Sequence, residues 1–246
     1  MPGSSHRSCK LFSRDIRLPA GSLRLHFVVA EAALELIPAE ALRDPSVRAD
    51  AERRGKEPEG ILLDRSLHHP ALLRMKDGYR RGRPDLVHLT LLSATSTPLH
   101  QDGGLVTYIH TIDDVVLAFR ERARPPKSYA RFRNLVEKLL EERPEEGVVS
   151  VREATLPQLL RSVGTDYVLG LSVQGAQSSL EDLAGRLVER RQPAVVVGGF
   201  PRGHFLPRDI KAFDQMARIG DRPLDAHVVT ARVIYEVERS LGRDQR

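Results

Sequence analysis

The residues with the clearest chemical possibilities are glycines near the C-terminal end of the chain. An apolar run, 194–197, is followed at once by Gly198 and Gly199, with Gly203 shortly after. A β-branched run of this kind predicts a strand buried on both faces. Glycines directly after such a strand let backbone N–H and C=O groups approach a ligand that a Cβ would hold off. The pattern indicates either a nucleotide-like pocket or an ordinary α/β turn, because the loop is not G-x-G-x-x-G.

A second loop with suitable chemistry lies at residues 219–224, ahead of a helical pattern in which apolar residues recur from Val229 to Leu241. Pro223 suits the first turn of that helix, and Asp221 is a plausible cap before it. We therefore expect a strand, a glycine loop, a second loop and a terminal helix, with both loops facing one pocket.

Basic residues gather in two further segments. Residues 80–85 read Arg-Arg-Gly-Arg-Pro-Asp, a rigid positive turn before the apolar run 86–92, which we interpret as a second buried strand. Residues 120–131 contain two prolines that keep the chain extended and present its basic side chains. Basic residues beside Tyr129 and Phe132 can bind phosphates and stack on exposed bases. The alternatives are a solvated charge cluster at residues 80–85 and, for Tyr129 and Phe132, a place in the core.

Composition is compatible with a nucleic-acid partner without requiring one. The 246 residues are 41% hydrophobic and 29% charged, with a net charge of +5 and a pI near 9.6. Of the 38 basic residues, 32 are arginine, the side chain that binds phosphate bidentately. A GC-rich genome or a thermophilic surface rich in ion pairs explains the same bias.

Several classes of function are disfavoured. Cys9 is the single cysteine, so the chain has no intrachain disulfide or cysteine-cluster metal site. The adjacent His68 and His69 cannot both face one ion from a regular helix or strand. No Ser/His/Asp or Cys/His arrangement stands out, and no dinucleotide fingerprint follows the first strand. No apolar run reaches the roughly 18 residues of a membrane span and no signal-peptide core is present, so we expect a cytoplasmic protein.

The remaining pattern places these loops in an α/β domain, because strands that alternate with helices predict a parallel sheet. Residues 105–119 read as a hairpin, 143–150 as a linker, and 1–22 as a flexible basic tail. The strands are expected at 23–30, 86–92, 105–110, 115–119, 166–172 and 194–197, and helices at about 132–142, 155–163, 180–191 and 223–241.

Four motifs in this order resemble those of one family. They are GRPDLVH (82–88), the basic segment ending at Arg131–Phe132, VVVGGFPRGHF (195–205) and IGDRPLDAHVV (219–229). They are similar to motifs of the ribosome-biogenesis pseudouridine N1-methyltransferases, which belong to the SPOUT class of RNA methyltransferases, and the chain looks like an archaeal-type member.

The resemblance implies an α/β fold of the SPOUT type, with a mostly parallel sheet flanked by helices, a C-terminal trefoil knot and an added β-hairpin extension. It implies a single domain over 23–246, with about 93–130 as the hairpin and RNA-binding extension and about 165–246 as the cofactor-binding region. The implied activity is transfer of a methyl group from S-adenosyl-L-methionine to N1 of a pseudouridine in small-subunit rRNA. The implied assembly is a homodimer working in ribosome biogenesis, with ribosome-assembly proteins as possible partners, and eukaryotic relatives are nucleolar. Two alternatives stay open: an rRNA-binding assembly factor with weak or no methylation, and a SPOUT methyltransferase with another RNA target.

The resemblance also assigns roles to site residues, and none of them is a metal ligand. Asp85 would stabilise the turn or accept a proton, and Ser96 stands where the family often has an aspartate. Asp64, His68 and His69 match a structural or substrate-side segment. Arg83, Arg124, Lys127 and Arg131 would bind RNA. The cofactor would contact Leu171, Ser172, Gly198, Gly199, Gly203, Ile219, Gly220, Asp221, Arg222, Pro223 and Leu224.

Overall fold

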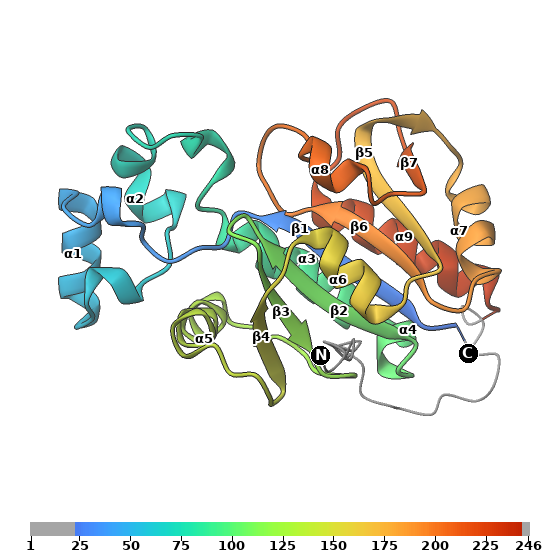
Figure 1. The fold of residues 1–246 in the computed structure, drawn as a ribbon, viewed down its shortest axis with the longest axis horizontal. Helices are drawn as coiled ribbons and strands as arrows, with labels where there is room; N and C mark the ends of the chain where they lie inside the picture. The colour runs from blue at the N-terminus through green and yellow to red at the C-terminus, as the bar shows by residue number, and fades with distance from the viewer. Residues whose placement is uncertain (1–22, 243–246) are drawn as a thin grey trace, which may run out of the picture.

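A seven-stranded mixed sheet forms the centre of the molecule (Figure 1). The computed structural model describes residues 23–242, so the expected tail at 1–22, with Cys9, lies outside the described residues. The strands are β1 (Leu25–Ala32), β2 (Leu105–Thr111), β3 (Val115–Phe119), β4 (Val149–Glu153), β5 (Tyr167–Gln177), β6 (Pro193–Gly198) and β7 (Gln215–Arg218). Their spatial order is β4-β3-β2-β1-β6-β5-β7. The β1, β2, β5, β6 and β7 strands are parallel, and β3 and β4 form an antiparallel end. The expected mostly parallel sheet is confirmed.

Helices cover both faces of this sheet. The helices α3 (Pro84–Thr95), α5 (Tyr129–Glu142), α7 (Leu180–Val188) and α9 (Ala226–Ser240) contribute to one apolar cluster, and α6 (Leu156–Val163) to the other. Short helices α4 (Pro98–Gln101) and α8 (Pro207–Ile210) complete the connections.

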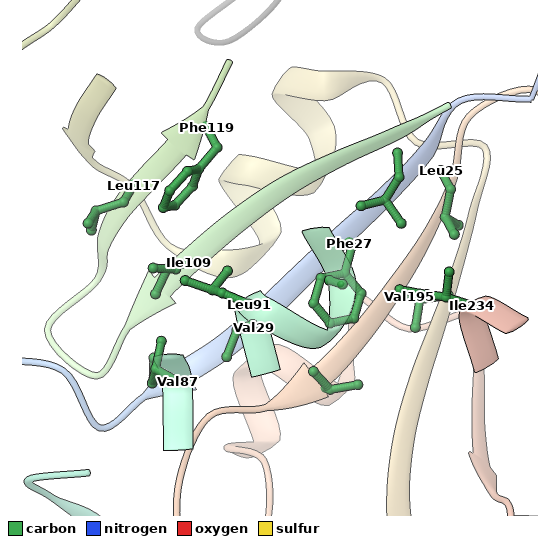
Figure 2. Close-up of a cluster of buried hydrophobic side chains, with 14 of the residues drawn as sticks. Leu25, Phe27, Val29, Val87, Leu91, Ile109, Leu117, Phe119, Val195 and Ile234 are labelled. Atoms are coloured by element: carbon green, nitrogen blue, oxygen red, sulfur yellow. The ribbon is translucent and has the colours of Figure 1, made fainter. Parts of the chain in front are cut away.

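The central strand β1 supplies both clusters, because successive side chains of a strand point to opposite faces. Phe27 and Val29 face α3 and α9, whereas Val28 and Ala30 face α6. Figure 2 shows Phe27 and Val29 among side chains from α3, β6 and α9. Burying each large apolar side chain contributes about 1.5–3 kcal/mol, so this layer fixes the strand ends that carry the loops.

A helical lobe, residues 34–82, is inserted between β1 and α3 and stands at one end of the sheet, on the left in Figure 1. It contains η1 (Ala39–Ala41), α1 (Pro45–Arg54), η2 (Pro58–Gly60), α2 (Arg65–Leu72) and η3 (Gly78–Arg80), and has a small core of its own. The buried carboxylate of Glu137 in α5 holds the lobe: it accepts hydrogen bonds from Arg54 Nη1 at 2.7 Å and Lys56 Nζ at 2.6 Å. The lobe begins and ends at the same place beside the end of β1, because the Arg83 N–H donates to the Ala33 carbonyl at 3.0 Å.

The interpretation of residues 86–92 as a strand is wrong, because they form the middle of helix α3. Val87, Leu91 and Ala94 are buried at helical spacing, while Leu89 is 48% exposed. Pro84 occupies the first turn, where a missing N–H costs nothing. A short apolar run does not distinguish a strand from a buried helix by periodicity, and this one was misassigned for that reason.

Other element boundaries also differ from expectation. The linker expected at 143–150 runs into β4. The stretch between the glycine loop and residue 219, for which no strand was expected, contains β7. The terminal helix begins at Ala226 with Asp225 as its N-cap, so Asp221 and Pro223 belong to the loop before it. The hairpin at 105–119 is confirmed, although its first strand is an integral part of the sheet. Within the described part of the chain, no helix is long and apolar enough to cross a bilayer.

Candidate functional site

A pocket of about 200 Å³ opens at the carboxyl ends of β5, β6 and β7. The glycine loop (residues 198–206) forms one wall, and the second loop (residues 219–225) forms the other. Leu86 of α3 and Val229 of α9 close its base. Parallel sheets place ligands at this edge, and the two loops meet there as expected.

Most of the residues expected to contact a cofactor line this pocket. Gly199, Asp221 and Pro223 are absent from its lining. Gly199 instead packs against β1: its N–H donates to the Ala30 carbonyl at 2.8 Å, and an added Cβ would lie 2.7 Å from Ala32 Cα. The expected residues found in the lining are Leu171, Ser172, Gly198, Gly203, Ile219, Gly220, Arg222 and Leu224.

Two aromatic side chains of the glycine loop also line the pocket, although the sequence analysis assigned them no role. The rings of Phe200 and Phe205 meet edge to face with centroids 5.5 Å apart, and Phe205 packs in the same way on Phe213. Their place within the glycine motif was the available signal. The pocket therefore combines apolar walls with accessible backbone, a surface suited to a flat heterocyclic group.

An ion pair behind the pocket holds the glycine loop in place. Glu31, at the end of β1, accepts hydrogen bonds from the Leu206 N–H at 2.7 Å and from Arg80 Nη2 at 2.6 Å. Arg80 also donates to the His204 carbonyl at 2.6 Å, and its guanidinium lies 4.3 Å from the centre of the Phe200 ring. Arg80 of the lobe thus joins the end of β1 to two positions of the glycine loop, Phe200 and His204.

The Arg80 contact explains why residue 203 is a glycine. Gly203 has φ of +97°, and an added Cβ would lie 2.8 Å from Arg80 Nη1. Burial raises the pKa of Glu31 to about 7, against the opposing effects of the Leu206 N–H and Arg80; the neighbouring Asp209 adds to the rise. The carboxyl therefore titrates near neutral pH, at a contact that shapes the pocket wall.

Arg83 and Asp85 form a bidentate pair at the first turn of α3. The Nε–Oδ1 and Nη2–Oδ2 distances are 2.7 and 2.8 Å. Burial alone would raise the pKa of Asp85, but the hydrogen bond and charge of Arg83 outweigh it and lower the pKa. This geometry fits the turn-stabilising role expected for Asp85 and makes it a weak proton acceptor. Among the described residues that line the pocket, Asp225 is the one carboxylate.

The second basic segment is exposed but does not reach the pocket lining. Arg124, Lys127 and Arg131 are exposed, as expected of side chains available to a partner. His88 Nε2 donates to the Pro126 carbonyl at 2.7 Å and its ring stacks on Phe132, which holds the segment against α3. Phe132 is fully buried, so its core role is confirmed.

Tyr129, considered for base stacking, and His68, assigned to a structural or substrate-side segment, both have partners within the protein. The Tyr129 hydroxyl donates to Asp64 Oδ2 and is committed to joining α5 to the lobe. His68 is fully buried, and its Nδ1 accepts from the Asp64 N–H at 3.1 Å. Burial lowers the pKa of His68, so its ring is neutral at pH 7. Within residues 23–242, no three His, Cys, Asp or Glu side chains are grouped as metal ligands would be.

Ser96 lies too far from the pocket to act there. It is the C-cap of α3, whereas Leu86, near the opposite end of that helix, lines the pocket. Ten residues of helix span about 15 Å. A serine in place of aspartate at this position therefore removes no carboxylate from the site.

Comparisons with known proteins agree with this geometry. A family model described as EMG1/NEP1 methyltransferase matches residues 27–238. A protein of Thermococcus sibiricus named ribosomal RNA small subunit methyltransferase Nep1 is 38% identical over 220 residues, covering 88% of this chain and 99% of that protein. A protein of the same name from Pyrobaculum arsenaticum is 40% identical over 221 residues, covering 87% and 98%. The crystal structure of Archaeoglobus fulgidus Nep1 bound to S-adenosylhomocysteine superimposes with a TM-score of 0.78 at 35% identity, covering 90% and 99%.

Proposed function

Because the chain belongs to the EMG1/NEP1 methyltransferase family, we propose that it methylates N1 of a pseudouridine in small-subunit rRNA. The chain is a small-subunit rRNA methyltransferase that uses S-adenosylmethionine. The observation that carries the proposal is the pocket between the glycine loop and the second loop, which suits this cofactor.

The residues present fit S-adenosylmethionine, although the structure carries no ligand. Gly198 and Gly203 line the pocket with backbone alone, and Leu171, Leu224 and Val229 supply apolar surface. When bound, the cofactor supplies an activated methyl group. The protein then has to align the acceptor nitrogen with that group, a task that needs no nucleophilic side chain in the pocket.

The proton on the acceptor nitrogen needs a destination, and Asp225 is placed to receive it. Asp225 caps α9, yet its side chain makes no capping hydrogen bond, so its carboxylate is available to the pocket. It is also close enough to Arg83 for its charge to raise the pKa of that arginine, an effect smaller than that of Asp85. An ionised carboxylate beside the acceptor can take the proton as the methyl bond forms.

RNA binding is assigned to Arg83 and to the exposed Arg124, Lys127 and Arg131. Arg83 stands at the start of α3, near the pocket mouth, and the other three form a basic strip held by His88 and α5. Phosphate contacts of this kind position the strand and weaken as salt concentration rises.

We assign a homodimer to the surface of α3 and α9, which pack on each other. Leu89 of α3 and Tyr235 of α9 are 48% and 55% exposed and offer apolar surface that a second copy of the chain could cover. Light scattering at micromolar concentration tests this assignment. A monomeric mass would contradict it, as would a dimer unaffected by Tyr235→Glu. The proposed place of action is the cytoplasm, and ribosome-assembly proteins are proposed partners.

A methylation assay tests the proposed reaction. Purified protein is incubated with S-adenosylmethionine carrying a labelled methyl group and with a small-subunit rRNA hairpin that contains pseudouridine, alongside the same hairpin with uridine. Label in the pseudouridine hairpin alone is expected, since N1 of uridine carries the ribose. Label in both hairpins, or in neither while cofactor binds, would contradict the N1 assignment.

A further inference from the structure

A second cavity of about 590 Å³ lies between the helical lobe and the glycine loop. We call it the lobe groove and define it by Arg65, His69, Tyr79, Arg83, Pro201 and Arg202. Pro201 lines both the lobe groove and the cofactor pocket, so the two cavities are neighbours. Arg83, the N-cap of α3, lines the lobe groove, and Leu86 in the first turns of the same helix lines the cofactor pocket. A polymer whose target unit enters the pocket would pass through this groove.

The charge of the lobe groove suits a polyanion. Three arginines and His69 line it, against one carboxylate, Asp77. Arg202 and His69 are exposed and have no ion pair with any residue in the described range. Arg83 is paired with Asp85 and Arg65 donates to the Gly78 carbonyl, so Arg202 is the arginine of the groove whose guanidinium is available to bind a phosphate bidentately.

The groove also presents surface for a base. The Tyr79 ring is 51% exposed, and the neighbouring Leu73 side chain is 73% exposed. An exposed aromatic ring flanked by arginines is the combination on which unpaired bases stack. A small anion or an acidic peptide would use the charge but leave this apolar surface uncovered.

Both walls of the groove are fixed before any ligand arrives. Arg80 ties the lobe to the glycine loop through Glu31 and the His204 carbonyl, and Arg81 Nε pairs with Glu35 Oε1 at 2.9 Å. The Arg65 guanidinium donates to the Gly78 carbonyl and holds the turn that carries Tyr79. A preformed groove spares the ordering cost that a mobile loop would add to binding.

We propose that the lobe groove binds one unpaired nucleotide next to the target, with its base stacked on Tyr79 and its phosphate held by Arg202. This assignment rests on the proposed RNA substrate and adds a specificity site to it. The groove then reads the strand beside the target nucleotide, while the cofactor pocket acts on the target itself.

Fluorescence anisotropy with the full chain and a labelled pseudouridine hairpin tests this assignment. Tyr79→Ala is expected to raise the RNA Kd by roughly 5- to 150-fold, the range for losing one stacked base, and to leave the S-adenosylhomocysteine Kd unchanged. Tyr79→Phe keeps the ring and should retain wild-type affinity. Arg202→Gln should weaken RNA binding and reduce its salt dependence. Arg74→Gln is the matched control, because Arg74 is a 67% exposed arginine on the same lobe that pairs with Asp44 outside the groove.

Abasic hairpins identify the bound nucleotide. Removing one base beside the target should weaken wild-type binding by the factor that Tyr79→Ala produces, and the two changes together should cost no more than either alone. Fully additive losses, or a Tyr79→Ala Kd within twofold of wild type, would overturn the assignment. Equal losses on a fully paired duplex would also overturn it, because they would indicate a general anion surface. Methylation by the wild-type protein is scored separately, so a wrong reaction and a wrong groove give different results.

Discussion

Replacing Arg80 with alanine tests whether the ion pair behind the pocket positions the glycine loop. Arg80 donates to Glu31 Oε2 and to the His204 carbonyl, both at 2.6 Å, and covers one face of Phe200. Hydrogen bonds that involve a charged group contribute about 1.5–3 kcal/mol each, and an exposed cation–π contact about 0.5–1 kcal/mol. The His204 contact is solvent-exposed and Glu31 can take up a proton, and both facts reduce the cost. We expect a loss of about 2–4 kcal/mol in the free energy of unfolding.

Part of that loss should appear as weaker cofactor binding. Each 1.4 kcal/mol of lost loop positioning lowers affinity about tenfold, so the S-adenosylhomocysteine Kd should rise at least about tenfold. Isothermal titration calorimetry measures the Kd, and urea unfolding followed by circular dichroism measures the stability. Arg80→Lys keeps the charge but loses the forked geometry, and should fall between wild type and Arg80→Ala.

Arg74→Ala is the control for losing a lobe arginine. Its partner Asp44 is buried but also accepts hydrogen bonds from Ser46, so the change should cost about 1–2 kcal/mol, and because neither residue lines the pocket the Kd should stay unchanged. If Arg80→Ala lowered stability but kept the S-adenosylhomocysteine Kd within twofold of wild type, the arginine would secure the lobe alone. The argument that it shapes the pocket would then be refuted.

Three further substitutions test other parts of the site. The pKa of Glu31 is raised from 4.5 in the unfolded chain to about 7 in the folded protein, so the folded state binds this proton more tightly. The free energy of unfolding therefore falls, by at most about 3 kcal/mol, as pH rises from 4.5 to 7. Arg80 and Asp209 face this carboxyl. Glu31→Gln removes the pH dependence, so the stability of the variant relative to wild type should improve from pH 5 to pH 8 in urea titrations. A difference in unfolding free energy that stays constant over this range would contradict the raised pKa. Gly199→Ala places a Cβ 2.7 Å from Ala32 Cα and should cost about 1–3 kcal/mol by thermal unfolding while weakening S-adenosylhomocysteine binding, and a wild-type melting temperature would count against it. Asp225→Asn should lower the kcat of pseudouridine methylation by about 10²–10⁴-fold with little change in cofactor Kd, and an unchanged kcat would remove Asp225 as proton acceptor.

The parts of the fold that could be predicted from the sequence are those with local signals. The apolar run of β6 and the alternating pattern of the β2–β3 hairpin each specify a strand without reference to the rest of the chain. The prediction failed for helix α3 because its apolar residues lie on all sides of the helix. One side packs on the sheet, and Leu89 is exposed on another. Strand β7 has four residues and takes its identity from pairing with β5, which no local pattern encodes.

The candidate site likewise contains residues that local motifs could identify and residues whose roles depend on contacts between distant parts of the chain. The loop motifs located the pocket, and most of the residues expected from them line it, because glycine, proline and aspartate have local conformational meaning. Glu31 and Arg80 are 49 positions apart, and their pairing depends on the lobe returning to the strand end. Gly199 was assigned to the cofactor because its neighbours were, although its close contact is with β1. The trefoil knot and the domain boundaries stay predictions.

The single crossing point at Ala33 and Arg83 has a consequence for how this enzyme can vary. The helical lobe begins and ends at one backbone hydrogen bond, between Arg83 and Ala33. Its length and sequence can therefore change without altering the register of β1 or the start of α3. An exchange of this segment with that of a relative would change one wall of the lobe groove, and it would leave the methyl-transfer pocket intact only if the new segment kept an arginine in the place of Arg80. RNA preference and catalysis are therefore separable traits in this architecture, coupled through the contact of Arg80 with Glu31.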